Sequence, residues 1–259
     1  GYGELITDTA RVPWDSADAL EQLIQRVGAD QVAAFVLEPV IAAGGVLFPP
    51  EGYLQRIADI CRTHDVILIA DEVVNAFGRQ GAWFASSRFG LQPDIVVCAK
   101  GLTSGYMPMG ALIVNDRVSG PFYDGAAGAW FHGYTWSGHA AGAAVAMANL
   151  DVVEREELAE NVLSLEPELP RILGGVASHS LVAGVRTGTG LMAAVELDAD
   201  AKTADPSLPR RVAAAMRDEG VLTRSMVGGE IQFSPPLVID TGHVEQFAAA
   251  LHAALDRVS

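Results

Sequence analysis

Lysine is scarce in this chain, and one of its two lysines ends an apolar run. The 259 residues include fifteen arginines but only Lys100 and Lys202 as lysines. A reaction that needs a deprotonated amine therefore has two candidates, because arginine keeps its proton. Lys202 lies in the acidic segment 200–205, which keeps its amine charged and solvated. Lys100 follows the apolar run 95–99, where a buried amine could attack an aldehyde and form a Schiff base. The alternative is a lysine that extends from a sheet edge into solvent.

Two acidic residues also end apolar runs. Glu38 follows residues 32–37, and Asp71 follows residues 66–70. Apolar runs of this length that alternate with amphipathic helices predict a mostly parallel sheet covered on both faces. Ligands bind at the carboxyl ends of the strands in such sheets. We therefore expect Glu38, Asp71 and Lys100 to converge on one edge. A loop cap, or an ion pair with Arg79, is the alternative role for Asp71.

The helices and strands that must hold these residues are predicted from the periodicity of apolar residues and from capping residues. The first half shows strands at 32–37, 66–70, 94–100 and 108–114. A helix capped by Asp15 or Ser16 ends at Gly28, and a second one carries Leu54, Ile57 and Ile60. An Ala-rich helix follows residue 138 and continues through residues 151–160. The pattern indicates an α/β sheet built from strand–helix–strand units.

The second half has a different character. It shows strands at 190–197, 221–226 and 230–233, a polar loop at 198–207, a helix ending near Gly220 and a last helix at 243–256. This pattern is typical of a separate α+β domain. We expect residues 1–157 to belong to a large domain and residues 158–259 to a small C-terminal domain.

Charge and composition exclude several function classes. The net charge of −15 argues against nucleic acid or an anionic membrane as partner, because phosphates require clustered cations. No apolar run approaches the roughly 18 residues of a membrane span. Cys61 and Cys98 lie in apolar settings, so we expect reduced core thiols and a cytoplasmic protein. The start, Gly1-Tyr2-Gly3, resembles neither an initiator methionine nor a signal peptide, and we expect a fragment or processed piece of a longer protein.

Four groups of residues occur in a fixed order. They are Glu38-Pro39-Val40 with Gly44-Gly45-Val46 and Pro49-Pro50-Glu51-Gly52-Tyr53; Ile69-Ala70-Asp71-Glu72-Val73 with Phe77-Gly78-Arg79; Pro93-Asp94-Ile95 with Ala99-Lys100-Gly101-Leu102; and His132-Gly133-Tyr134-Thr135-Trp136-Ser137-Gly138-His139. Their order and spacing resemble the class III aminotransferases. The likeness covers nearly the whole chain and is strongest over residues 36–142.

The resemblance implies fold type I, that of the transferases dependent on pyridoxal phosphate, with part of the large domain followed by the small domain. It also implies roles for particular residues. Lys100 would form the aldimine with pyridoxal 5'-phosphate, and Asp71 would hold the pyridinium nitrogen. Val73, on the same side of an extended strand as Asp71, would press on one ring face. Thr135 would bind the phosphate of a neighbouring subunit across a homodimer interface, and it could also cap the Ala-rich helix. Glu38 would either hydrogen-bond in the site or fix its loop.

The implied reaction moves an amino group from an amine or omega-amino acid to a 2-oxo acid such as pyruvate. Arg224 would bind the substrate carboxylate, with a surface salt bridge as the alternative. Other class III chemistry (aminomutase, decarboxylase or racemase) and a non-catalytic fragment stay open. The resemblance places the phosphate loop and much of the substrate pocket before residue 1, so the choice of donor and acceptor is left open. No metal site is expected, and His132 and His139 are interpreted as loop residues.

Overall fold

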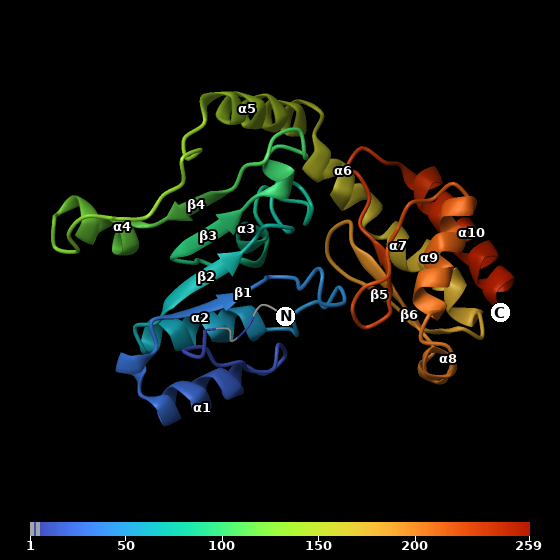
Figure 1. Cartoon of the computed structure of the whole chain (residues 1–259), viewed down its shortest axis with the longest axis horizontal. Coiled ribbons are helices and arrows are strands. Elements are labelled where there is room, and N and C mark those ends of the chain that lie inside the picture. Colours follow the sequence, from blue (N-terminus) through green and yellow to red (C-terminus); the bar gives the residue numbers. More distant parts are fainter. Residues whose placement is uncertain (1–2, 4–5) are drawn as a thin grey trace.

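The computed structural model describes residue 3 and residues 6–259, and it contains two separate sheets (Figure 1). Gly1 and Tyr2, on which the expectation about the start of the chain depends, lie outside the described residues. The first sheet has four strands in the order β1-β2-β3-β4, and the second has three in the order β5-β6-β7. The long helix α5 (Ala140–Arg155) lies beside the first sheet, and α6 (Leu158–Leu165) then leads to the second half.

The first sheet contains the strands that end next to Glu38, Asp71 and Lys100. Its strands are β1 (Ala34–Leu37), β2 (Ile67–Asp71), β3 (Ile95–Cys98) and β4 (Ala111–Val114). β1, β2 and β3 are parallel, and β4 is antiparallel to β3. The helices of this half are α1 (Ala17–Val27), α2 (Tyr53–Thr63), α3 (Ala85–Phe89), α4 (Asp116–Tyr123) and α5 (Ala140–Arg155). The mostly parallel α/β sheet is as expected.

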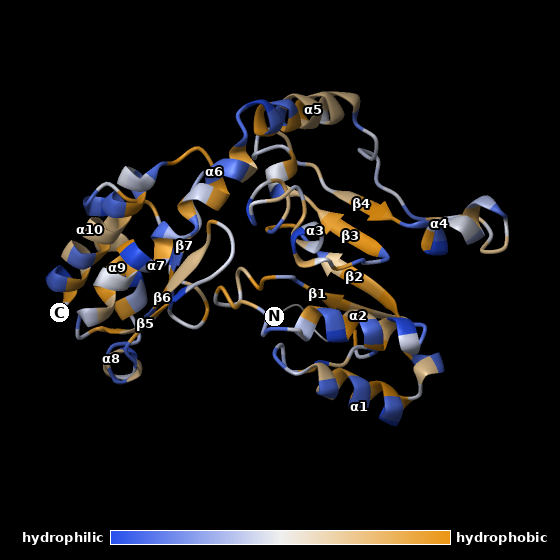
Figure 2. Cartoon of the chain, turned by 180° about the vertical axis from the view of Figure 1, so that it is seen from behind, coloured by the Kyte–Doolittle hydropathy of each residue, from blue (hydrophilic) through white to orange (hydrophobic). Residues whose placement is uncertain are grey.

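Local sequence explains where the first helices begin and end. The Ser16 hydroxyl accepts a hydrogen bond from Ala19 N at the start of α1, and Gly28, with φ of 98°, ends it. The apolar stripes of α1 and α2 pack on one face of β1 and β2, with Leu20, Ile24 and Ile57 in the core. Figure 2 shows apolar residues along β2 and β3, while much of the outer surface of α1 is hydrophilic.

The cover of this sheet is less complete than expected. Val36 on β1 and Leu112 and Ile113 on β4 are exposed. β4 is an edge strand, and α5 packs beside the segment after β3 rather than over β4. The prediction of a sheet covered on both faces is therefore met only in part within the described residues.

Two predicted boundaries in this half were wrong. The strand expected over 94–100 ends at Cys98, because Ala99 and Lys100 leave the β-region of φ and ψ. The single Ala-rich helix expected to reach residue 160 is broken at Glu157, whose φ of 50° is left-handed. The chain continues there as α6 (Leu158–Leu165) and α7 (Glu168–Leu173).

The second sheet is antiparallel and covered by helices. Its strands are β5 (Val182–Thr187), β6 (Ala193–Leu197) and β7 (Ile231–Phe233). α8 (Ala199–Ala204), α9 (Leu208–Asp218) and α10 (Thr241–Val258) complete this half. A short helix, α8, occupies part of the loop expected at 198–207. Residues 221–226 do not form the expected strand, since only Ser225 forms an isolated bridge, to Ile231.

β6 is buried on both faces, and its alternate residues contribute to two cores. Val195 and Leu197 point into the helical core of α7, α9 and α10. Met192, just before β6, and Ala194 instead pack with Val40, Val46 and other residues of the loop after β1. The second sheet is thus packed against the end of the first.

Polar contacts connect the same two halves. The Arg88 guanidinium binds the Glu166 carboxylate through two hydrogen bonds of 2.8 Å. Gln80, which is fully buried, accepts a hydrogen bond from Thr189 Oγ1 at 3.0 Å. The turn between β5 and β6 is therefore held against the segment after β2. In the part of the chain that the structure describes, no helix is long and apolar enough to cross a membrane.

The helical core of the second half generates a stability prediction. Leu251 on α10 is 0% exposed, whereas Leu222 is 76% exposed. We expect Leu251→Ala to lower the free energy of unfolding by about 3 kcal/mol, because it leaves a cavity in a packed core. The control Leu222→Ala should change it by less than about 0.5 kcal/mol. Urea denaturation followed by circular dichroism measures both, and equal losses for the two variants would contradict this core.

Candidate active site

The ends of three parallel strands bring the acidic residues and the lysine to one edge. Leu37 pairs with Ala70, and Asp71 pairs with Val97, so β1, β2 and β3 end side by side. Glu38 follows β1 directly, and Lys100 lies two residues after β3. The charges of Asp71 and Lys100 both act on the Glu38 carboxyl. The structure thus places these three side chains within electrostatic reach of one another.

Lys100 has an unusual backbone conformation. Its φ is 40°, which places a residue with a Cβ in the left-handed region. The side chain is exposed, and among the described residues its Nζ donates no hydrogen bond. Lys202, in contrast, donates to Gly228 O at 3.1 Å. Of the two amines, Lys100 is the one left available for a ligand.

Asp71 ends β2 and turns the chain there. Its Oδ1 accepts a hydrogen bond from Val73 N at 3.1 Å. Among described residues, no hydrogen bond engages Oδ2, which leaves this oxygen for a proton-bearing ligand atom. Arg79 does not pair with Asp71. Its guanidinium donates instead to Leu191 O at 2.9 Å, and burial lowers the pKa of Arg79 to about 10.

Val73 lies in a turn rather than in an extended strand. The expectation that it continues β2 on the same side as Asp71 was wrong, because the Asp71 side chain captures the Val73 amide and starts a turn at once. Val73 nevertheless lines a cavity of about 690 Å³ together with Ala99, the residue before Lys100. Its side chain is therefore adjacent to the lysine-bearing segment.

Glu72, which the sequence reasoning passed over, anchors the same turn from inside. It is 0% exposed, and its carboxylate accepts hydrogen bonds from Ala85 N at 2.5 Å and Ser86 N at 2.9 Å. Its own amide donates to Val97 O at 2.8 Å. A buried carboxylate must be compensated in this way. The only available signal was its position beside Asp71.

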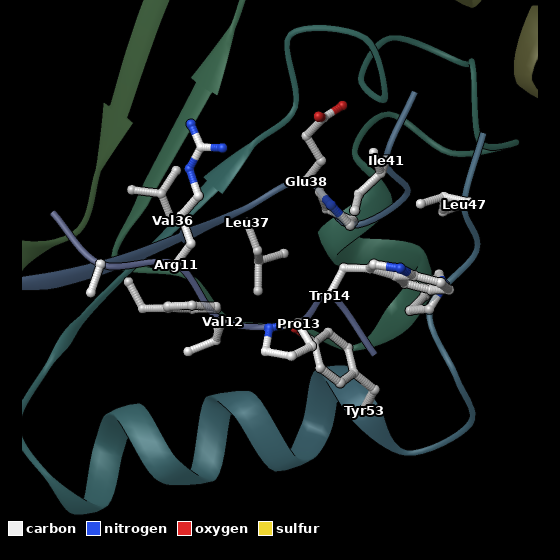
Figure 3. A pocket seen from close by; sticks show the side chains of 14 residues that line it. Arg11, Val12, Pro13, Trp14, Val36, Leu37, Glu38, Ile41, Leu47 and Tyr53 are labelled. Atoms are coloured by element: carbon white, nitrogen blue, oxygen red, sulfur yellow. The ribbon is translucent and has the colours of Figure 1, made fainter. Parts of the chain in front are cut away.

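Glu38 stands at the rim of a hollow between β1 and residues 10–14. Figure 3 shows its carboxylate and the Arg11 guanidinium projecting to one side, with Tyr53 near the start of α2. The hollow has a volume of about 290 Å³. The carboxylate accepts a hydrogen bond from Ala42 N at 3.0 Å. Burial raises the pKa of Glu38, the Ala42 N–H lowers it, and the charge of Asp71 raises it further.

Thr135 belongs to an exposed turn and does not cap the Ala-rich helix. The N-cap of α5 is His139, whose Nδ1 accepts from Gly142 N at 3.1 Å. Thr135 lies too far before Ala140, the first helical residue, for its hydroxyl to reach the amides of the first turn. His132 joins an edge-to-face ladder, with ring centroids 5.3–5.8 Å apart, formed with Phe122, Trp130 and Tyr134. Thr135 itself does not line the cavity shared by Val73 and Ala99, although its neighbours Tyr134 and Trp136 do.

Arg224 lies in the second half of the chain. Its Nε donates to Gln232 Oε1 at 2.6 Å, so the surface salt bridge considered for it is replaced by an amide contact. Both residues line a cavity of about 530 Å³ whose walls include none of Glu38, Asp71 and Lys100. Its guanidinium keeps further donors for an anion.

Asn149 is a second residue that the sequence reasoning missed. It lies on α5 and donates hydrogen bonds to Gly101 O and Leu102 O, directly after Lys100. The signal was its spacing from Ala146 and Val153, which puts a polar side chain on the buried stripe of an Ala-rich helix. Across the described ranges, no group of three or more His, Cys, Asp or Glu side chains is placed to hold a metal ion.

Comparison with known proteins identifies a family and several relatives. The family model described as aminotransferase class-III matches residues 7–255. The diaminobutyrate–2-oxoglutarate transaminase of Halomonas elongata is 42% identical over 94% of this chain and 54% of its own length. The putrescine–pyruvate aminotransferase of Pseudomonas aeruginosa is 39% identical over the same shares of the two chains.

Solved structures give the same result. A thermostable omega transaminase mutant from Pseudomonas jessenii has a TM-score of 0.86 and 40% identity, over 94% of this chain and 55% of that one. These structural neighbours show that the fold is that of the transaminases. The chain spans about half the length of the relatives it matches.

The raised pKa of Glu38 predicts a dependence of stability on pH. A carboxyl whose pKa is raised by folding stabilises the folded state below its ordinary value of 4.5, and this contribution is lost as pH rises through the folded-state value. Glu38→Gln keeps an acceptor for the Ala42 N–H but removes the ionisation. We therefore expect the variant to be more stable than the natural chain at neutral pH, with the gain disappearing below about pH 4.5.

Thermal unfolding at several pH values measures this difference. Glu51→Gln, an exposed position in the same loop, is the control and should show no such trend. A Glu38→Gln variant that is less stable at neutral pH would contradict the assignment.

Proposed function

The chain belongs to the class III aminotransferases, and from this membership we propose that the protein transfers an amino group from an amine or omega-amino acid to a 2-oxo acid such as pyruvate. The observation that carries the proposal is the arrangement of Lys100 and Asp71. A lysine with no hydrogen-bonded partner among the described residues follows β3, and a carboxylate ends the neighbouring strand. Relatives named as omega-aminotransferase and putrescine–pyruvate aminotransferase support the choice of substrates.

Class III aminotransferases depend on pyridoxal phosphate, and the residues of this edge fit that group. When bound, it supplies an aldehyde for primary amines and a ring that accepts electron density. Lys100 Nζ is the exposed amine that would hold the aldehyde. Asp71 Oδ2, which accepts no hydrogen bond from the described residues, would hold a proton on the ring nitrogen, and Val73 would contact a ring face.

The same side chains account for proton transfer. When not bonded to the cofactor, Lys100 Nζ would be a base able to take a proton from the donor carbon and return it nearby. The Asp71 carboxylate would accept the hydrogen bond of a proton held on the ring nitrogen. Glu38 holds the loop after β1 through Ala42 N, and its carboxylate lies close enough to influence both groups.

Arg224 is proposed to bind the substrate carboxylate. Among the described residues, its exposed guanidinium is held only by the amide of Gln232, which a carboxylate could displace. The residue lies at the rim of a cavity in the second half of the chain. This role requires that one substrate molecule, in the whole protein, can contact both Arg224 and the edge that carries Lys100.

A homodimer in which Thr135 reaches the neighbouring site is part of the proposal. The segment around Thr135 exposes a group of large apolar side chains, and Phe131 is 96% exposed. The others are Tyr123, Trp130, Tyr134 and Trp136. Contiguous exposed aromatic residues mark interaction surfaces. An exposed Thr135 within such a surface is consistent with a phosphate contact made to a partner subunit.

Two further assignments rest on indirect support. We place the domain boundary near residue 157, because α5 ends at Arg155 and the helical core of the second half begins with Val162. We also propose a cytoplasmic location. Cys61 and Cys98 are both buried and free, as expected for a chain in a reducing compartment.

The central test is chemical labelling of Lys100. Borohydride treatment with pyridoxal phosphate should fix the mass of the cofactor on the peptide that contains Lys100, as measured by mass spectrometry. In the complete enzyme, Lys100→Ala should reduce the formation of alanine from pyruvate by at least about a thousandfold. Removal of a catalytic nucleophile has an effect of this size in other enzymes. Only transamination makes alanine, so this product also separates it from the other class III reactions.

Lys202→Ala is the matched control, because it removes the only other lysine. This variant should keep both the label and the activity. Label on Lys202 instead of Lys100, or full activity in Lys100→Ala, would overturn the proposal.

The role of Arg224 predicts a change in substrate binding. Arg224→Ala should raise the KM for pyruvate roughly tenfold or more, since a hydrogen bond to a charged group contributes about 1.5–3 kcal/mol. The KM for an amine donor without a carboxylate should change little. Arg217→Ala, which removes another exposed arginine of the same cavity, is the control. Equal effects of the two variants on the KM for pyruvate would exclude a specific role for Arg224.

A further inference from the structure

The backbone at Lys100 needs support from outside its own loop. β3 ends at Cys98, Ala99 has φ of −162° and ψ of −145°, and Lys100 follows with φ of 40°. A residue with a Cβ in the left-handed region costs about 1–2 kcal/mol and persists only where the surroundings enforce it. The hydrogen bonds within the loop, from Leu102 N to Ala99 O and from Thr103 N to Lys100 O, are local and do not anchor the loop to another element.

Asn149 supplies the external support. Its Nδ2 donates to Gly101 O at 2.8 Å and to Leu102 O at 3.2 Å, using both of its hydrogens. These carbonyls belong to the two residues that directly follow Lys100. In the part of the chain that the structure describes, no other side chain from outside the loop forms a hydrogen bond to residues 99–103.

The helix that carries Asn149 is itself well fixed. Ala146 and Val153, one turn to either side, are buried. Ala146 of α5 packs in one apolar cluster with Phe77 and with Leu102 of the loop. This cluster joins α5 to the loop. A polar side chain on such a buried stripe is costly unless it is hydrogen-bonded. The amide is therefore held in place by packing and can in turn hold the loop.

We propose that Asn149 is the positioning residue for Lys100, an inference that rests on the function proposed above. By bonding the two carbonyls after Lys100, it fixes the direction in which the loop leaves β3 and so keeps the amine at the edge shared with Asp71. Without this support, the Lys100 backbone relaxes toward an ordinary conformation and displaces Nζ from the edge shared with Asp71.

The chain offers a closely matched control for this role. Asn161 on α6 is also a half-buried asparagine whose Nδ2 donates to two backbone carbonyls, Leu237 O at 2.7 Å and Ile239 O at 2.9 Å. Asn149→Ala and Asn161→Ala remove the same chemistry, so they should cost similar stability. They differ in whether the carbonyls belong to the lysine-bearing loop.

The test combines two measurements on both variants. Hydrogen–deuterium exchange without added cofactor should show amides of residues 101–106 exchanging about tenfold faster in Asn149→Ala only. Borohydride labelling with pyridoxal phosphate should be slowed at Lys100 by about tenfold to a hundredfold in the same variant, because small displacements of a reacting group have effects of this size. In the complete enzyme, kcat should decrease by a larger factor than the factor by which the KM for the amine donor changes.

The outcomes separate the two proposals. If the natural chain takes up no label on Lys100, the proposed function fails. If it does, but Asn149→Ala is labelled as fast as Asn161→Ala, only the positioning role is overturned. Should Asn149→Ala fail to fold by circular dichroism, Asn149→Ser replaces it, because a short hydroxyl cannot bond both carbonyls, and the same comparison decides.

Discussion

The parallel pairing of β1, β2 and β3 is the constraint on which the candidate site depends. Parallel strands in one register end at the same edge, so residues far apart in the sequence become neighbours without any specific attraction. Glu38, Asp71 and Lys100 are brought together in this way. The helices that bury one face of β1 and β2 keep that register, because a slip by one residue would turn the apolar side chains away from the core.

Much of this arrangement could be predicted from the sequence because it follows from repeated patterns. The apolar runs, the caps Ser16 and Gly28 and the order of the acidic strand ends carry strong periodic or local signals. The failures concern competition between nearby groups. Asp71 captures the Val73 amide and starts a turn, and His139 takes the cap position expected for Thr135. Such choices are made between neighbouring groups and leave no periodic trace in the sequence.

Longer-range misses have a different cause. Glu157 breaks the predicted helix because the chain must turn toward the second sheet, and residues 221–226 have strand-like composition but form only one bridge. The contribution of Asn149 to the Lys100 loop depends on packing between elements almost fifty residues apart. The left-handed backbone of Lys100 also has no sequence signature, since lysine is not a residue that favours it. Tertiary contacts determine all of these features.

The burial of β6 on both faces affects how the protein unfolds. Val195 belongs to the helical core of the second half, whereas Ala194 beside it packs on the loop after β1. A single strand therefore contributes to both hydrophobic cores, and neither half can lose its packing without exposing apolar surface of the other. We therefore expect thermal melting of the two halves to be coupled into one cooperative event, although their sheets are separate. Cleavage between α5 and α6 would accordingly release two unstable pieces instead of two autonomous domains.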